Sequence, residues 1–135
     1  MKELEEKYVQ NQLLKGEVEE LLKQKEIIEQ KIFELNMTKS TIGEISKIKK
    51  GDFIWAPIGS DVFVSARIED NKTFLSRVGA DVSVKKTGQD VIKILDRQIK
   101  ELNNSINQIN ITVGKYVQEL KKIEDEIIRL RKKNS

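Results

Sequence analysis

The strongest constraint on this chain is a series of apolar residues, spaced three and four apart, across its last third. The spacing continues from Ile92 to Leu130, through about six heptads, without a polar interruption. Polar and charged residues fill the gaps, so the apolar stripe is too narrow for a globular core and is typical of a coiled coil. The a positions are Ile92, Ile99, Ile106, Val113, Leu120 and Ile127, and the d positions are Leu95, Leu102, Ile109, Tyr116, Ile123 and Leu130.

The first third of the chain carries a weaker version of the same pattern. Its d positions are apolar, namely Leu14, Leu21, Ile28, Leu35 and Ile42, whereas its a positions are mixed, namely Leu4, Asn11, Val18, Lys25, Ile32 and Lys39. Polar a residues cost stability but can fix the register and the partner. We therefore expect helices over 3–48 and 88–133, each of about 45 residues or roughly 65 Å. Folded back on each other as an antiparallel hairpin, they would place Ile42 near Ile92, and Leu14 near Leu120 or Ile123.

Residues 51–86, between the two helical stretches, are β in character. Apolar residues alternate with polar ones after residue 62, and Pro, Gly, Asn and Asp punctuate the stretch. These signals predict four strands near 52–56, 62–68, 73–78 and 82–86, arranged as two hairpins. Thr87, with Asp90 three residues later, predicts a capping box at the start of the second helix. The expected fold is α+β: one domain over 1–135, with a long antiparallel coiled-coil hairpin and a four-strand insert between its helices.

A β insert of this size buries too little apolar surface to be stable alone, because the gain does not offset its ordering entropy. Its hairpins also leave strand edges unpaired. We therefore expect the insert to be the oligomerisation surface, covered by the same segment of other subunits. The residues assigned to this surface are Phe53, Trp55, Val62, Phe63, Val64, Ile68, Phe74, Val78, Val82 and Val84.

Composition argues against most chemistry. Among 135 residues there is no Cys and no His, which removes the thiol ligands, the commonest general base and the commonest metal ligand. No phosphate-binding glycine loop is present, so we expect no enzyme activity, no cofactor and no ATP site. Acidic and basic residues alternate along both helices, which favours a solvated face over nucleic-acid binding. The sequence has no membrane-length apolar run and no secretory signal, so a cytoplasmic location without membrane attachment is expected.

The insert resembles that of the alpha class of prefoldin, whose members place two β-hairpins between the helices of a coiled coil. The most specific part is WAPIGSDVFVSARIED, which is similar to the first hairpin of the family, while RVGADVSVKK is similar to the second. The sequence departs from the family pattern at Asp81, Val82, Ser83 and Lys85, where a second Gly, two aromatics and a Glu are usual.

The resemblance implies an ATP-independent holding chaperone of the archaeal type. Such complexes are hexamers of two alpha and four beta subunits, which capture non-native proteins at the coiled-coil tips and pass them to a group II chaperonin. The partners implied are therefore beta-class prefoldin subunits or further copies of this chain, non-native proteins and a group II chaperonin. The alternative is a filament-forming coiled-coil protein of the gamma-prefoldin type, which the altered second hairpin leaves open.

The free end of the coiled coil is where we expect clients to bind. A two-stranded seam needs only its a and d positions, so further apolar residues on an exposed helix are surplus to it. Both helices carry such residues near the chain ends, and seam contacts there fray easily. The candidate client-binding residues, surplus and seam together, are Leu4, Tyr8, Val9, Leu13, Leu14, Ile123, Ile127, Ile128 and Leu130.

Two further function classes compete with the chaperone. A structural filament or spacer protein would use the same coiled coil and grow fibres when purified alone. A nucleic-acid-associated coiled coil with a hinge-like insert would show binding that falls steeply with salt.

Overall fold

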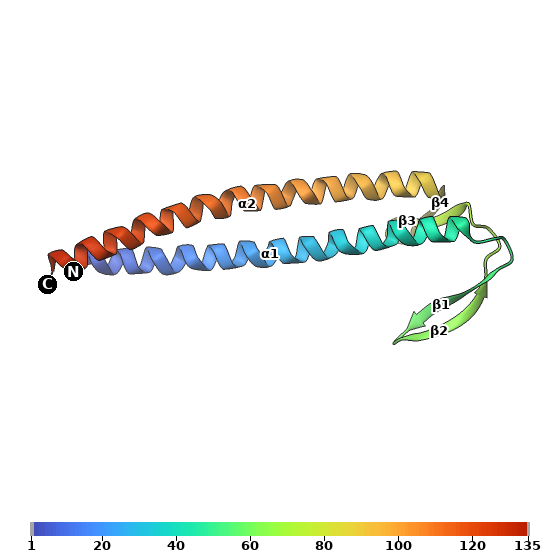
Figure 1. The fold of residues 1–135 in the computed structure, drawn as a ribbon, viewed down its shortest axis with the longest axis horizontal. Helices are drawn as coiled ribbons and strands as arrows, with labels where there is room; N and C mark the ends of the chain where they lie inside the picture. Colours follow the sequence, from blue (N-terminus) through green and yellow to red (C-terminus); the bar gives the residue numbers. More distant parts are fainter. Residues whose placement is uncertain (1, 135) are drawn as a thin grey trace. The chain divides into compact units, whose positions relative to one another are not determined.

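The computed structural model describes residues 2–134 as two long helices with four short strands between them (Figure 1). This order confirms the predicted α+β fold class, and both helices end within one residue of the expected positions. The elements are α1 (Lys2–Lys47), β1 (Phe53–Gly59), β2 (Val62–Arg67), β3 (Thr73–Gly79), β4 (Val82–Thr87) and α2 (Gly88–Lys133).

The chain forms two compact units. The first, here called the free-end unit, takes in α1 up to Ile32 and α2 from Lys100. The second, here called the hairpin unit, is the segment Phe33–Ile99, with the adjoining ends of both helices and all four strands. Each unit has its own stretch of seam, so the packing of each is described in turn.

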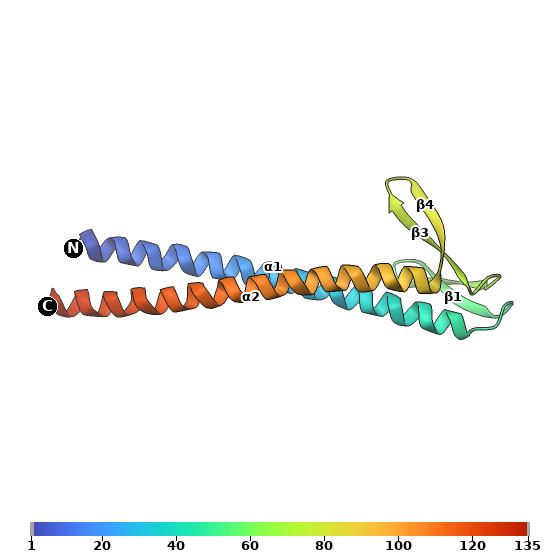
Figure 2. The same ribbon diagram turned by 90° about the horizontal axis from the view of Figure 1, so that it is seen from above.

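In the free-end unit, α1 and α2 run antiparallel and both chain ends lie at the same end of the unit (Figure 2). The buried residues fall on the predicted heptad positions: Asn11 on α1, and Ile109, Ile123, Ile127 and Leu130 on α2. Lys7, a polar d position, lies 2.5 Å from Glu126, measured from Nζ to Oε2. An ion pair across the seam opposes slippage, because a shift by one turn would separate the two charges.

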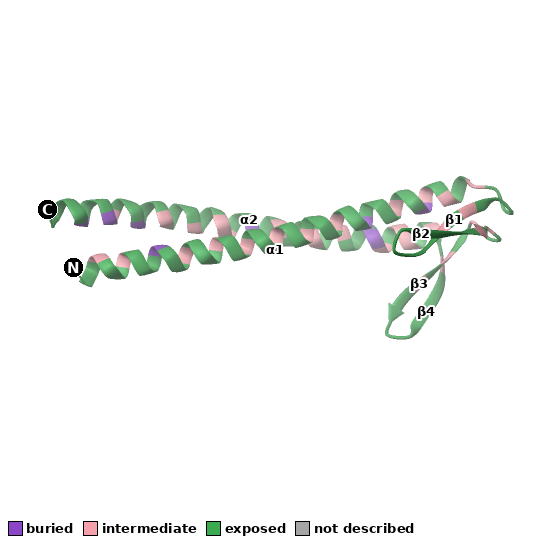
Figure 3. Ribbon diagram, turned by 90° about the horizontal axis from the view of Figure 1, so that it is seen from below, coloured by how far each residue is buried: buried purple, intermediate pink, exposed green. Residues whose placement is uncertain are grey.

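The hairpin unit repeats this arrangement. Leu35, Ile42 and Leu95 are buried on the predicted heptad positions, along the facing sides of the helices (Figure 3). Lys39, a polar a position of α1, forms an ion pair with Asp96 of α2. Two polar seam residues of α1, Lys7 and Lys39, therefore meet acids on α2, which supports the expected role of such residues in fixing register.

Each β-hairpin is an antiparallel two-stranded sheet of its own, as predicted. Strand β1 runs on to Gly59, whereas the sequence indicated an end near residue 56. Pro57 follows the predicted end and is one of the residues that punctuate the stretch, but it pairs with Phe63 inside the ladder. The reason is that β1 has no neighbour on its other side, and an edge strand tolerates the missing N–H of proline.

The base of the second hairpin is tied to both helices. Thr87 Oγ1 accepts a hydrogen bond of 3.2 Å from the backbone N–H of Asp90, which confirms the expected cap of α2. Asn71 Nδ2 donates to the carbonyl oxygen of Ile48 (2.6 Å), just past the end of α1, and more weakly to that of Ser46. A Cβ atom at Gly88 would lie 3.2 Å from Phe74 Cε2, so only glycine allows this approach without adjustment.

Candidate functional site

Exposed apolar side chains occur at the free end, on the hairpins and along the middle of the helices, and the first two groups contain residues predicted from the sequence. The mid-helix group consists of Leu22, Ile27, Phe33, Met37, Ile111 and Val117. At the free end, a hollow of about 190 Å³ lies between the two helices. Its apolar wall is made by Leu13, Leu14 and Ile123, which confirms the expected neighbourhood of Leu14 and Ile123, and Gln10, Glu17 and Glu119 complete the lining. A mixed, shallow surface of this kind suits contact with another chain rather than small-molecule chemistry.

The structure divides the candidate client-binding residues into two sets. Ile123, Ile127 and Leu130 are buried in the seam, and Leu4 and Leu14 are half-buried there. The surplus residues face outward, with Leu13 66% exposed, and this set consists of Tyr8, Val9, Leu13 and Ile128. The seam residues are therefore covered while the helices are paired, and only the surplus set is available to a partner.

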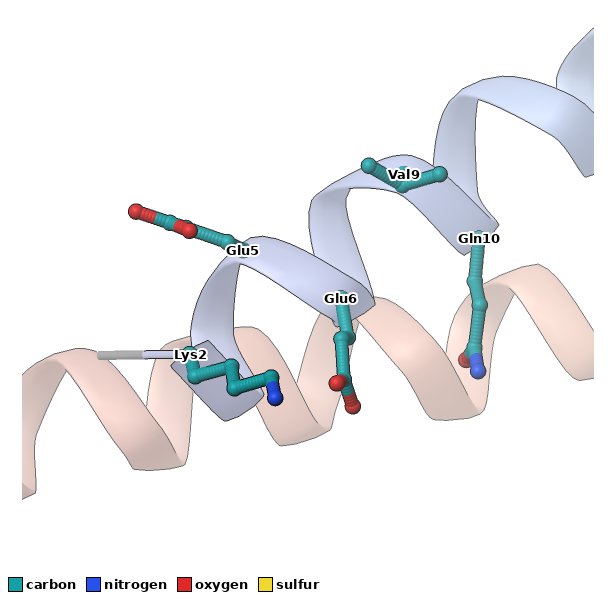
Figure 4. A pocket seen from close by; sticks show the side chains of 5 residues that line it. All are labelled: Lys2, Glu5, Glu6, Val9 and Gln10. Atoms are coloured by element: carbon teal, nitrogen blue, oxygen red, sulfur yellow. The ribbon is translucent and has the colours of Figure 1, made fainter.

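A second depression lies on α1 itself, near its start (Figure 4). Lys2, Glu5, Glu6, Val9 and Gln10 line it, and Val9 is the single apolar residue among them. Figure 4 shows the Val9 side chain directed away from the side taken by Glu6 and Gln10. The carboxylates and the lysine here are solvated surface groups, so we assign the depression no chemistry.

On the hairpins, most of the predicted oligomerisation residues are exposed. Trp55 is 73% exposed. Ile68 and Phe74 are the exceptions, because both are half-buried within the chain. Exposed members of the predicted set are Phe53, Trp55, Val62, Phe63, Val64, Val78, Val82 and Val84.

Sequence reasoning missed two exposed apolar residues of the hairpins, Ile58 and Leu75. Leu75 is 70% exposed and lies opposite Lys85, on the face of its hairpin that Phe74 does not occupy. Alternation along the strand could have revealed it, since neighbours in a strand point to opposite faces. Ile58 adjoins the register shift between Pro57 and Gly59, where alternation alone does not predict the face.

The electrostatics of the described residues are local. Thr73 donates its hydroxyl to Asp70, and together with the N–H of Lys72 it holds the pKa of that carboxyl below its ordinary value. At the free end, the hydrogen bond and charge of Lys7 lower the pKa of Glu126. Both carboxylates thus stay ionised at neutral pH, where they serve a loop and an ion pair rather than proton transfer.

Two negative findings complete the survey of residues 2–134. No group of three or more potential metal ligands comes together in this part of the chain. Neither α1 nor α2, over the described residues, has a stretch apolar enough to cross a membrane.

Comparison with known proteins bears directly on this architecture. The family described as "Prefoldin subunit" matches residues 14–133, which takes in most of both helices and the whole insert. The chain belongs to the prefoldin family. Prefoldins are non-enzymatic chaperone subunits that assemble into oligomers.

Similar curated proteins are archaeal alpha subunits of prefoldin. Prefoldin subunit alpha 1 of Thermococcus kodakarensis is 36% identical over 101 residues, covering 74% of this chain and 68% of that protein. Prefoldin subunit alpha of Thermofilum pendens is 25% identical over 109 residues, covering 81% and 84% respectively. The resemblance of the chain to the alpha class is thereby confirmed.

Two solved structures share the fold. The filamentous prefoldin from Methanocaldococcus jannaschii, solved by cryo-electron microscopy, superposes with a TM-score of 0.77 at 16% identity, covering 85% of this chain and 95% of that one. The prefoldin beta subunit from Thermococcus strain KS-1 gives 0.59 at 15% identity, covering 93% and 89%. At such low identity the likeness supports the fold alone.

Proposed function

We propose that the protein is an ATP-independent holding chaperone subunit. It captures non-native proteins on the surplus apolar residues of its free end, assembles through its β-hairpins and passes clients to a group II chaperonin. The observation that carries this proposal is the exposure of large apolar side chains at these two places, outside the a and d seam. Within a prefoldin fold, such exposure supplies one surface for clients and another for subunits.

The surplus set suits clients without a fixed sequence. Tyr8, Val9 and Leu13 on α1, with Ile128 on α2, flank buried seam residues rather than forming a deep pocket. Unfolded chains present apolar side chains in no set order, so an adaptable apolar surface binds many of them weakly. No nucleotide is required, because capture needs only the burial of apolar area.

The test is a triple substitution at the free end, Val9→Ser, Leu13→Ser and Ile128→Ser. These side chains are exposed, so the seam stays intact and helicity is retained. Suppression of aggregation of a model unfolded protein should then fall steeply, with and without ATP. A deletion of both chain ends is less informative, because it would also remove the buried seam residues Ile123 and Ile127.

The matched control removes exposed apolar residues from the same helices away from the chain ends. The control variant combines Ile27→Ser, Ile111→Ser and Val117→Ser. All three side chains are more than half exposed and belong to the free-end unit. Capture should be retained in this control. Equal loss in both triple variants would indicate that general surface hydrophobicity is responsible, and full retention in the first would refute the proposed client site.

A filament-forming coiled-coil protein is the second candidate. It is favoured by the departure of the second hairpin from the alpha-class pattern at Asp81, Val82, Ser83 and Lys85. A filamentous prefoldin, that of Methanocaldococcus jannaschii, has the same fold. Electron microscopy of the purified chain, alone and with a beta-class prefoldin subunit, separates the two. Fibres from the chain alone support the filament, whereas discrete particles that form only with the partner support the hexameric chaperone.

A further inference from the structure

The two β-hairpins are structural equivalents whose surfaces differ in chemistry. Their registers match at an offset of 20 residues, so that Phe53↔Arg67 corresponds to Thr73↔Thr87, and Gly59↔Val62 to Gly79↔Val82. Each hairpin also has its register shift at the same place, just before its turn. Equivalent positions can therefore be compared side chain by side chain.

One face of the first hairpin is aromatic. Phe53 and Trp55 lie two residues apart on β1, and Phe63 lies opposite Pro57, which puts all three on the same face. All three are more than half exposed. The only charge on this face is Arg67, whose guanidinium carbon lies 5.0 Å from the centre of the Phe53 ring. We call Phe53, Trp55 and Phe63 the aromatic face.

The equivalent face of the second hairpin is cationic. Leu75 and Arg77 replace Trp55 and Pro57, and Lys85 lies opposite Leu75. Arg77 and Lys85 are exposed around the leucine. We call Leu75, Arg77 and Lys85 the cationic face. An exposed leucine gains free energy when a partner removes it from water. The two cations beside it favour an aromatic partner, because arginine and lysine bind the faces of aromatic rings.

The charges around the two faces are also of opposite sign, acidic on the first hairpin and basic on the second. Residues 52–70, which carry the first hairpin, contain four acidic side chains and one basic one. Residues 72–87, which carry the second, contain four basic side chains and one acidic one. Two second hairpins brought together would therefore repel each other, whereas a first and a second hairpin attract.

Within one chain the two hairpins do not pair, since each forms a separate two-stranded sheet (Figure 2). We propose that the aromatic face of one copy binds the cationic face of a second copy, so that self-assembly is head-to-tail. This inference rests on the assembly part of the proposed function and adds to it a direction and a partner. A head-to-tail contact closes into a ring or continues as a filament, because two copies joined by one contact still have one unused face of each kind between them.

The test uses two half-defective variants. The first, Trp55→Ser with Phe63→Ser, removes the aromatic face; the second, Arg77→Glu with Lys85→Glu, inverts the cationic face. Sedimentation should show assemblies for the unmodified chain and monomers for each variant alone. An equimolar mixture of the two should give dimers and nothing larger, because only one intact face of each kind remains.

A charge control guards against general effects of the added acids. Lys115→Glu with Lys121→Glu makes the same change in net charge on exposed positions of α2, and it should assemble like the unmodified chain. Circular dichroism establishes that every variant keeps its helices. Added salt should weaken assembly of the unmodified chain, because the contact joins opposite charges.

Two outcomes would overturn the inference. Dimers of either variant alone would show that like faces pair with like. A monomeric unmodified chain that assembles only with a beta-class subunit or on an anionic polymer would show that the cationic face serves another partner. Neither result bears on client capture, which the free-end substitutions test separately.

Discussion

At the scale of single residues, the glycines of the two helices differ in what surrounds them. Gly16 and Gly114 lie at exposed helical positions, and an added Cβ would meet nothing within 4 Å at either. At Gly88 an added Cβ would lie 3.2 Å from Phe74 Cε2 and 3.3 Å from Ile42 Cγ2. Space, rather than helix propensity alone, therefore decides the effect of alanine at each.

We predict that Gly16→Ala stabilises the protein by about 1 kcal/mol, the usual difference in helix propensity. Gly88→Ala should destabilise it, since the ring of Phe74 and the side chain of Ile42 must move. Thermal unfolding followed by circular dichroism measures both, and Gly114→Ala serves as a second open-site control. If Gly16→Ala destabilised the protein, Gly16 would have to contact another residue or another subunit, although it is exposed on α1 in this structure.

The Lys7–Glu126 ion pair predicts a pH dependence at the free end. Lys7 lowers the pKa of Glu126, so the pair stabilises the fold fully above the ordinary glutamate pKa of about 4.3. This contribution is lost as the pH falls through the lowered pKa and the carboxylate takes up a proton.

The measurement is the difference in melting temperature between the protein and Lys7→Gln. We expect a difference at neutral pH that vanishes in acid, and Lys15→Gln, at an exposed position, should show none. A difference that persisted at low pH would indicate that Lys7 acts through the packing of its alkyl chain.

At the scale of elements, the sequence predicts the helices best, both their bounds and the residues that face the opposite helix. A heptad repeat is local, so it identifies the facing residues of each helix whatever the rest of the chain does. Positions such as Leu35, Ile109 and Ile123 are accordingly buried where the pattern put them. Even the mixed a positions were informative, because Lys39 meets an acid across the seam.

The hairpins were predicted in number and order, but their faces were not. The sequence places Phe74 on the assembly surface, yet it is half-buried beside Gly88, whereas its neighbour Leu75, outside the predicted set, is exposed. Burial here depends on where the hairpin base meets the helices, and residues far apart in sequence decide that contact. The aromatic and cationic faces likewise emerge only when the cross-strand register is known.

One side chain holds the link between the hairpins to the end of α1, and its removal should loosen the second hairpin selectively. Asn71→Ala deletes the 2.6 Å hydrogen bond to the carbonyl oxygen of Ile48. We expect a loss of about 1 kcal/mol and faster hydrogen exchange of the amides of β3 and β4. Asn104→Ala, at an exposed site of α2, is the control. Unchanged exchange in the second hairpin would show that Gly88 and Thr87 hold it unaided.

At the scale of the whole molecule, the chain combines a seam with a proposed assembly surface, and the two have no residue in common. The seam is mostly apolar and is closed within the chain, whereas most of the large side chains of the hairpins are exposed. Subunit association and helix pairing should therefore respond to different substitutions.

The decisive comparison is a reciprocal pair of variants. Trp55→Lys with Val64→Lys places charges on both faces of the first hairpin, so the sedimenting mass should fall while helicity stays unchanged. Ile109→Ala cuts a buried seam side chain and should cost about 2 kcal/mol of helix stability, with the assembled mass retained below the melting temperature. If the hairpin variant lost its helicity, or if Ile109→Ala dissociated the folded assembly, the seam and the assembly surface would be coupled. Subunit contacts would then be part of what holds each helix pair together.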